Sequence, residues 1–187
     1  MKTSDIEARL RRVRLVIFDV DGVLTDGAIL LTDDGREMKR FNVHDGTGIN
    51  YLQRAGLPVG ILSGRRSRAV NRRARELDIK LVLQDCKVKE DGLDRILRRT
   101  GARVEEICYV GDDLPDVPVM RRVGLAVAPA DAGPEVRAIA HWVTRARGGA
   151  GVAREVAERV LKAQKKWGGV IERYGLKPRA RRTGVAP

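Results

Sequence analysis

The chain has 187 residues and a formal charge of +12, from 37 Lys and Arg against 25 Asp and Glu. This length suits one domain with a full core, and no segment is apolar enough over sufficient length to cross a membrane. The charged start lacks a signal-peptide core and the two cysteines form no disulfide or zinc pattern, so we expect a cytoplasmic protein. The charge predicts an anionic partner. A phosphorylated metabolite is favoured over nucleic acid, because aromatic residues that could stack single strands make up only 4%.

The hydrophobic pattern predicts strands that alternate with helices. After a helical lead over residues 1–12, strands are expected at 13–20, 59–62, 81–83, 107–110, 125–128 and 142–144, with a β-hairpin inserted over 28–43. Helices are expected at 48–55, 67–77, 89–100 and 150–166. This order predicts an α/β fold over residues 13–166, a Rossmann-like parallel sheet flanked by helices with no separate cap domain. Residues 167–187 are expected to form a flexible basic tail.

Polar side chains gather at the carboxyl ends of the expected strands, where open α/β sheets bind ligands. They are Asp19, Asp21, Ser63, Asp112 and Asp113, joined by Lys89 at the start of a helix. Carboxylates two residues apart on a strand repel each other unless a cation or a proton lies between them. Oxygen ligands without histidine or thiolate favour Mg²⁺, and Mg²⁺ beside a lysine and a hydroxyl suits chemistry on phosphate.

Each of these features also has a plainer interpretation. Asp19-x-Asp21-Gly22 could begin a calcium loop, but the glutamate and the third acid of an EF-hand are missing. Taken alone, Ser63-Gly64 is typical of a turn and Lys89 of a solvated helix residue. Their order along the chain with the acids favours a catalytic site.

The residues from Asp19 to Asp26, followed by Ser63-Gly64-Arg65, Lys89 and Gly111-Asp112-Asp113-x-x-Asp116, resemble the haloacid dehalogenase-like phosphohydrolases. From about residue 13 to 166 the chain is most similar to the capless, tetrameric branch of that family. The resemblance implies a Mg²⁺-dependent phosphatase for a phosphorylated eight-carbon 2-keto-3-deoxy sugar acid. A nine-carbon sialic-acid-type phosphate and a broader range of sugar phosphates are the alternatives. A non-enzymatic binding or regulatory module is a further one, although such a module need not keep all the catalytic acids.

The resemblance also implies catalytic roles. Asp19 would attack phosphorus to form an aspartyl-phosphate, while Asp21 would protonate the leaving oxygen and later activate water. Ser63 would bind a phosphoryl oxygen, and Lys89 would neutralise Asp19 and the developing charge.

The same resemblance implies a metal site. Mg²⁺ would be held by the Asp19 side chain, the backbone carbonyl of Asp21 and Asp112. Asp113 and Asp116 would order the surroundings of the metal.

The substrate-binding residues are expected on both sides of the hairpin. Arg65 is favoured for the sugar-acid carboxylate, because a guanidinium pairs with it through two parallel hydrogen bonds. The other candidates are Thr25, His44, Asp45 and Gly64, and His44 is equally typical of a structural hydrogen bond. With no cap domain, the hairpins of a homotetramer are expected to cover neighbouring sites.

Overall fold

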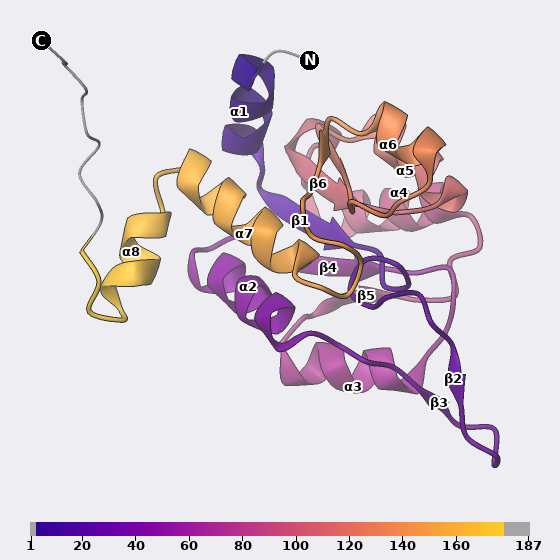
Figure 1. The fold of residues 1–187 in the computed structure, drawn as a ribbon. Coiled ribbons are helices and arrows are strands. Elements are labelled where there is room, and N and C mark those ends of the chain that lie inside the picture. Colours follow the sequence, from indigo (N-terminus) through magenta and orange to yellow (C-terminus); the bar gives the residue numbers. More distant parts are fainter. Residues whose placement is uncertain (1–2, 178–187) are drawn as a thin grey trace, which may run out of the picture.

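The computed structural model describes residues 3–177, and its strands form a six-stranded parallel sheet in the order β5-β4-β1-β6-β7-β8 (Figure 1). The strands are β1 (Leu15–Phe18), β4 (Val59–Leu62), β5 (Leu81–Leu83), β6 (Ile107–Val110), β7 (Leu125–Ala128) and β8 (Trp142–Val143). The central strands are buried along their whole length, as expected when helices cover both faces of a parallel sheet. The expected α/β architecture is confirmed.

Helices cover the two faces of the sheet in separate groups. One face packs against α1 (Thr3–Arg12), α2 (Val43–Arg54), α3 (Arg68–Glu76) and α7 (Val152–Ala163). The other packs against α4 (Lys89–Thr100), α5 (Val117–Arg122) and α6 (Pro134–Ile139), with the 3₁₀ turns η1 (Val104–Glu106) and η2 (Leu114–Asp116) beside them. The sequence pattern did not predict α5 and α6, which are six residues long and too short to show a clear periodicity.

Helices α2 and α7 lie side by side across the sheet (Figure 1). A Cβ atom on Gly48 would come within 2.7 Å of the Cα of Arg154, so the glycine permits this close approach. Helix α2 begins five residues before the expected helix, because the side chain of Asn42 accepts the backbone N–H of His44 and caps it.

The hairpin is shorter than expected. Strands β2 (Leu30–Leu31) and β3 (Glu37–Met38) pair antiparallel and project away from the body of the molecule (Figure 1). Leu31 is 67% exposed and Met38 52%. Within the described chain, only this hairpin and α2 lie between β1 and β4, where a cap domain would be inserted.

The expectation of a flexible tail from residue 167 is wrong at its start. Helix α8 (Trp167–Glu172) packs against the body of the protein: Val170 is buried, and the Trp167 ring meets that of Tyr51 edge to face at 5.8 Å. Burial of these apolar side chains orders a segment that its charges alone would leave solvated. Residues 178–187 of the expected tail lie outside the described residues. Among residues 3–177, no helix combines the length and apolarity that a membrane span requires.

Candidate active site

The site lies where the strand order reverses, at the carboxyl ends of β1 and β6, which is the usual ligand position in open α/β sheets. The Asp19 N–H donates to the carbonyl of Val110 at 2.9 Å, which holds the residue after β1 against the end of β6. A cavity of about 330 Å³ opens here. Its lining includes Asp19, Asp21, Gly22, Gly27, Ser63, Gly64, Arg65, Lys89, Asp112, Asp113, Pro115 and Asp116.

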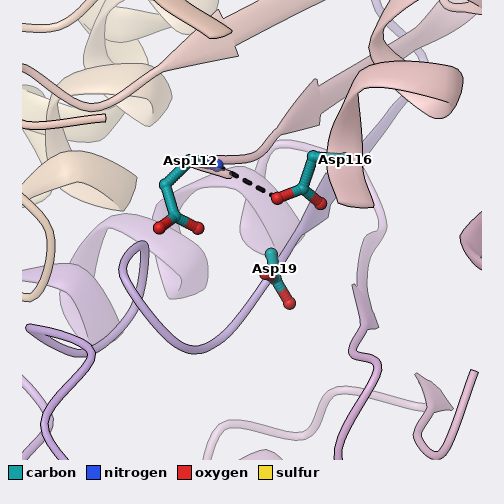
Figure 2. Close-up of side chains that lie close together, drawn as sticks. All are labelled: Asp19, Asp112 and Asp116. Atoms are coloured by element: carbon teal, nitrogen blue, oxygen red, sulfur yellow. Dashed lines mark hydrogen bonds between the residues drawn. The ribbon is translucent and has the colours of Figure 1, made fainter. Parts of the chain in front are cut away.

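Three carboxylates converge in this cavity (Figure 2). Asp19, Asp112 and Asp116 each offer an oxygen atom within 4.8 Å of the other two. Burial, together with the charge of Asp116, raises the pKa of Asp19 to about 7, although Lys89 opposes the shift. Burial and the charges of Asp116 and Asp19 raise the pKa of Asp112 to about 7 as well. The positive charge that the protein supplies is therefore too small to balance these carboxylates, and a bound cation or a proton has to neutralise the remainder.

Asp116 is fully buried and uses both of its oxygens within the protein. Its Oδ1 accepts from Lys89 Nζ at 2.5 Å and from the hydroxyl of Tyr109. Its Oδ2 accepts the backbone N–H groups of Asp112 at 3.1 Å and Asp113 at 3.3 Å (Figure 2). Because its hydrogen-bonding capacity is spent in this way, Asp116 is suited to positioning its neighbours rather than to binding a metal directly.

Lys89 connects the acids through its buried ammonium group. Its Nζ lies 2.7 Å from Oδ2 of Asp19, and the side chain is only 5% exposed. Burial alone would lower the pKa of Lys89, but the charges of Asp19 and Asp116 raise it above its usual value. The side chain therefore stays protonated and holds Asp19 in place.

The donor set fits Mg²⁺. Among the described residues, the buried Oδ1 of Asp112 has no hydrogen-bond partner, which is unusual for a buried carboxylate oxygen. Gly22 has φ +83°, and a Cβ there would lie 2.0 Å from Asp112 Oδ2. Any residue other than glycine at this position would therefore displace the Asp112 carboxylate. Oxygen ligands of this kind, with no thiolate or imidazole among them, match a hard cation.

Comparison with known proteins places the chain in a family. The sequence model of the haloacid dehalogenase-like hydrolases matches residues 45–124. The 3-deoxy-D-manno-octulosonate 8-phosphate phosphatase KdsC of Yersinia pestis is 43% identical over 163 residues, which cover 87% of each chain. The chain belongs to the haloacid dehalogenase-like hydrolases. The expected family and enzyme class, a phosphoric monoester hydrolase, are thereby confirmed.

Solved structures agree with this assignment. A probable phosphatase of the yrbi family from Pseudomonas syringae has 43% identity and a TM-score of 0.90, with 94% of this chain and 100% of that chain covered. The 3-deoxy-D-manno-octulosonate 8-phosphate phosphatase of Moraxella catarrhalis, solved with magnesium, phosphate and KDO, has 34% identity and a TM-score of 0.90, covering 92% and 99% of the two chains.

Most of the residues expected at the site meet in this cavity. They are Asp19, Asp21, Ser63, Gly64, Arg65, Lys89, Asp112, Asp113 and Asp116. Ser63 is buried, and its Oγ accepts the Arg65 N–H at 3.3 Å. The carboxylate of Asp21 stands apart from the other acids: it accepts from the ammonium of Lys39 and lies 3.8 Å from Nε of Arg65.

Two of the expected substrate-binding residues, Thr25 and Asp45, lie outside the lining of this cavity and make local structural contacts. Thr25 is buried, and its hydroxyl donates to the carbonyl of Val20 at 3.3 Å and accepts the Gly27 N–H at 3.2 Å, which shapes the loop after β1. Asp45 is also buried. Its carboxylate accepts the N–H groups of Gly151 at 3.2 Å and Arg154 at 3.0 Å, so it caps the first turn of α7.

His44 does not line the cavity of its own chain either. Its side chain is exposed at the start of α2, where its backbone N–H donates to Asn42 at 2.8 Å. Within this chain, none of Thr25, His44 and Asp45 reaches the acids.

The sequence reasoning missed three polar residues beside the site. They are Tyr109, which binds Asp116, and the hairpin pair Glu37 and Lys39. The Lys39 side chain is 1% exposed and lies 3.4 Å from Glu37, which in turn binds Arg65 at 2.6 Å. Two signals were present in the sequence: a hydroxyl within an apolar strand, and two opposite charges two residues apart at the end of the hairpin.

Proposed function

We propose that this protein is a Mg²⁺-dependent phosphatase that hydrolyses 3-deoxy-D-manno-octulosonate 8-phosphate to the free sugar acid and phosphate. The main support is the convergence of Asp19 and Asp112 beside the buried ammonium of Lys89, at the edge of the sheet where α/β proteins bind ligands. The names of the KdsC relatives, and the magnesium, phosphate and KDO in the Moraxella catarrhalis structure, support the cofactor and the substrate.

In the proposed reaction Asp19 is the nucleophile. Its carboxylate attacks phosphorus while the bond between phosphorus and the sugar oxygen breaks, which leaves an aspartyl-phosphate on the protein. Asp21 gives a proton to the departing oxygen and then takes one from the water that hydrolyses the aspartyl-phosphate. Lys89 favours the ionised form of Asp19 and stabilises the charge on the phosphoryl oxygens, one of which Ser63 binds.

The residues that would hold Mg²⁺ are the Asp19 side chain, the Asp21 backbone carbonyl and Asp112. When bound, the metal offsets the repulsion between the nucleophile and the anionic phosphate. Asp113 and Asp116 would act around it: Asp116 binds the backbone N–H groups of Asp112 and Asp113 and so fixes the loop that carries the ligand.

Arg65 is the proposed partner of the sugar-acid carboxylate. In this structure its guanidinium pairs with Glu37 of the hairpin at 2.6 Å, so it can hold a carboxylate at the rim of the cavity, beside the Ser63-Gly64 turn.

The assembly is proposed to be a cytoplasmic homotetramer. The hairpin exposes Ile29, Leu30, Leu31 and Met38, and two-residue strands of this kind are marginal unless they pack against a further surface. His44 would then be available to the site of a neighbour. The two free, buried cysteines support a reducing compartment.

A panel of sugar phosphates, ranked by kcat/KM, tests the substrate. The proposal predicts a clear preference for the eight-carbon acid over nine-carbon sialic-acid-type phosphates and over hexose phosphates, which have no carboxylate for Arg65. A preference for a nine-carbon acid would move the assignment to that substrate. A flat profile would contradict a sugar-acid phosphatase and favour a broad sugar phosphatase.

A further inference from the structure

A second cavity, of about 390 Å³, lies at the other end of the strands from the acids. Its lining residues come from the end of α2, the turn after α7 and helix α8. Helix α2 ends at Arg54 and the chain then enters β4 at Val59, so this cavity faces the amino ends of the strands. It shares no lining residue with the catalytic cavity. Any ligand bound here would therefore be remote from the proposed chemistry.

The walls of this cavity are cationic. Arg54, Lys165, Lys166 and Arg173 line it, and no carboxylate side chain does. Lys166 has a structural partner, because its Nζ donates to the carbonyl of Ala55 at 3.0 Å and caps α2. Within residues 3–177, no carboxylate oxygen lies within 4.0 Å of the charged nitrogens of the other three. Like charges gathered without counter-charge repel one another, so an anion would relieve this repulsion.

The same cavity has an aromatic wall. Tyr51 and Tyr174 line it, with ring centroids 6.1 Å apart, and the Trp167 ring contacts that of Tyr51 edge to face. The guanidinium of Arg154 lies 4.9 Å from the centre of the Tyr51 ring, so that ring already has a partner on its face. Tyr174 is 58% exposed, and its ring offers an open surface for stacking.

We propose that this cavity binds a nucleotide, with the phosphates on Arg54, Lys165 and Arg173 and the base against Tyr174. The volume falls within the range of small-molecule sites, about 300–1,000 Å³. A simple phosphate would use the cations but not the aromatic wall, so the combination favours a ligand that has both an anionic and a planar part. The proposed catalysis assigns no role to the basic residues Lys165 and Arg173 after α7, whereas a nucleotide site does.

Calorimetric titration of the full chain with ADP in EDTA tests the proposal. The double variant Arg54→Ala/Arg173→Ala should weaken ADP binding at least tenfold. The variant Arg99→Ala/Arg121→Ala removes the same charge from exposed positions outside the cavity and should bind ADP within twofold of wild type. Hydrolysis of 3-deoxy-D-manno-octulosonate 8-phosphate by the cavity variant should remain at the wild-type rate. If no variant or wild-type protein hydrolyses it, the proposed function fails, while the ADP titrations still decide the binding site.

Two further titrations separate the parts of the ligand. Tyr174→Ala should weaken ADP binding several-fold and leave the weaker binding of pyrophosphate unchanged, because only ADP has a base to stack. The proposal is overturned if wild type fails to bind ADP, or if the two double variants lose affinity equally, which would indicate non-specific attraction. It is also overturned if pyrophosphate binds as tightly as ADP, or if Arg65→Ala abolishes binding, which would place ADP in the catalytic cavity.

Discussion

Replacing Asp19 with asparagine should stabilise the metal-free protein at neutral and alkaline pH, although it removes the proposed nucleophile. The side chain of Asp19 is buried, and burial together with Asp116 raises its pKa from 3.8 to about 7 despite the nearby ammonium of Lys89. Between these two pH values the folded chain holds a proton that the unfolded chain has released. Folding is therefore coupled to proton uptake at this residue.

The stability that this proton contributes is complete below the unfolded pKa of 3.8 and is lost as the pH rises through about 7. A difference of about 3 pKa units corresponds to roughly 4 kcal/mol at 1.36 kcal/mol per unit. Asparagine is neutral at every pH and keeps that contribution. Asp19→Asn should therefore unfold with a free energy about 2–4 kcal/mol above wild type at pH 8 in EDTA, and with little difference at pH 4.

Urea unfolding in EDTA, followed by circular dichroism at pH 4, 6 and 8, measures this difference. Mg²⁺ should reduce it at pH 8, because the cation stabilises the ionised carboxylate of wild type. Asp26→Asn is the matched control. Its carboxyl is exposed, and the Ala28 N–H and Arg40 hold its pKa below the usual value, so neutralising it should give no gain. A lower stability of Asp19→Asn at pH 8, or a difference that does not vary with pH, would refute the reasoning.

Three other substitutions test the contacts around the acids. Lys89→Met leaves buried carboxylates without their ammonium. It should lower kcat at least about 100-fold and the free energy of unfolding by about 3–5 kcal/mol. Phosphate release and urea unfolding measure the two losses, and near wild-type turnover would contradict the proposed role of Lys89. Tyr109→Phe removes one hydrogen bond to Asp116. It should lower the free energy of unfolding by about 1.5–3 kcal/mol and reduce kcat by a larger factor than it raises KM. Equal stability of wild type and variant in urea would show that this hydrogen bond contributes nothing. Gly22→Ala should raise the Mg²⁺ concentration for half-maximal activity at least tenfold, because its Cβ would displace the Asp112 carboxylate; an unchanged metal titration would rule out that packing.

The candidate catalytic acids could be predicted from the sequence because their positions depend on local chain geometry. Asp19 and Asp112 each follow closely on a short apolar run, and such runs form neighbouring strands of the parallel sheet. Asp45 shows the opposite case. Its carboxylate binds the N–H of Gly151, which is 106 residues away, and no local pattern shows that contact. The bond between Tyr109 and Asp116 likewise becomes visible only once strand and turn are placed together.

The boundaries of helices and strands were likewise predictable where a local pattern sets them and not where a distant contact does. Helix α4 and strands β5, β6 and β7 match the predicted residues, because a clear periodicity or an apolar run defines each of them. Helix α2 begins earlier than predicted, since its first turn is polar and contains Gly46, and its cap at Asn42 outweighs those weak propensities. Helix α8 is folded because Val170 is buried against other elements, and the composition of the segment does not reveal this contact.

Trapping the phosphorylated protein tests the central claim most directly. A single turnover of ³²P-labelled 3-deoxy-D-manno-octulosonate 8-phosphate with Mg²⁺, quenched in acid, should leave label on the peptide that contains Asp19. Hydroxylamine should release that label, as expected of an acyl phosphate, and Asp19→Asn should show neither label nor turnover. Full hydrolysis without label on this peptide, or hydrolysis that persists in Asp19→Asn, would contradict the account.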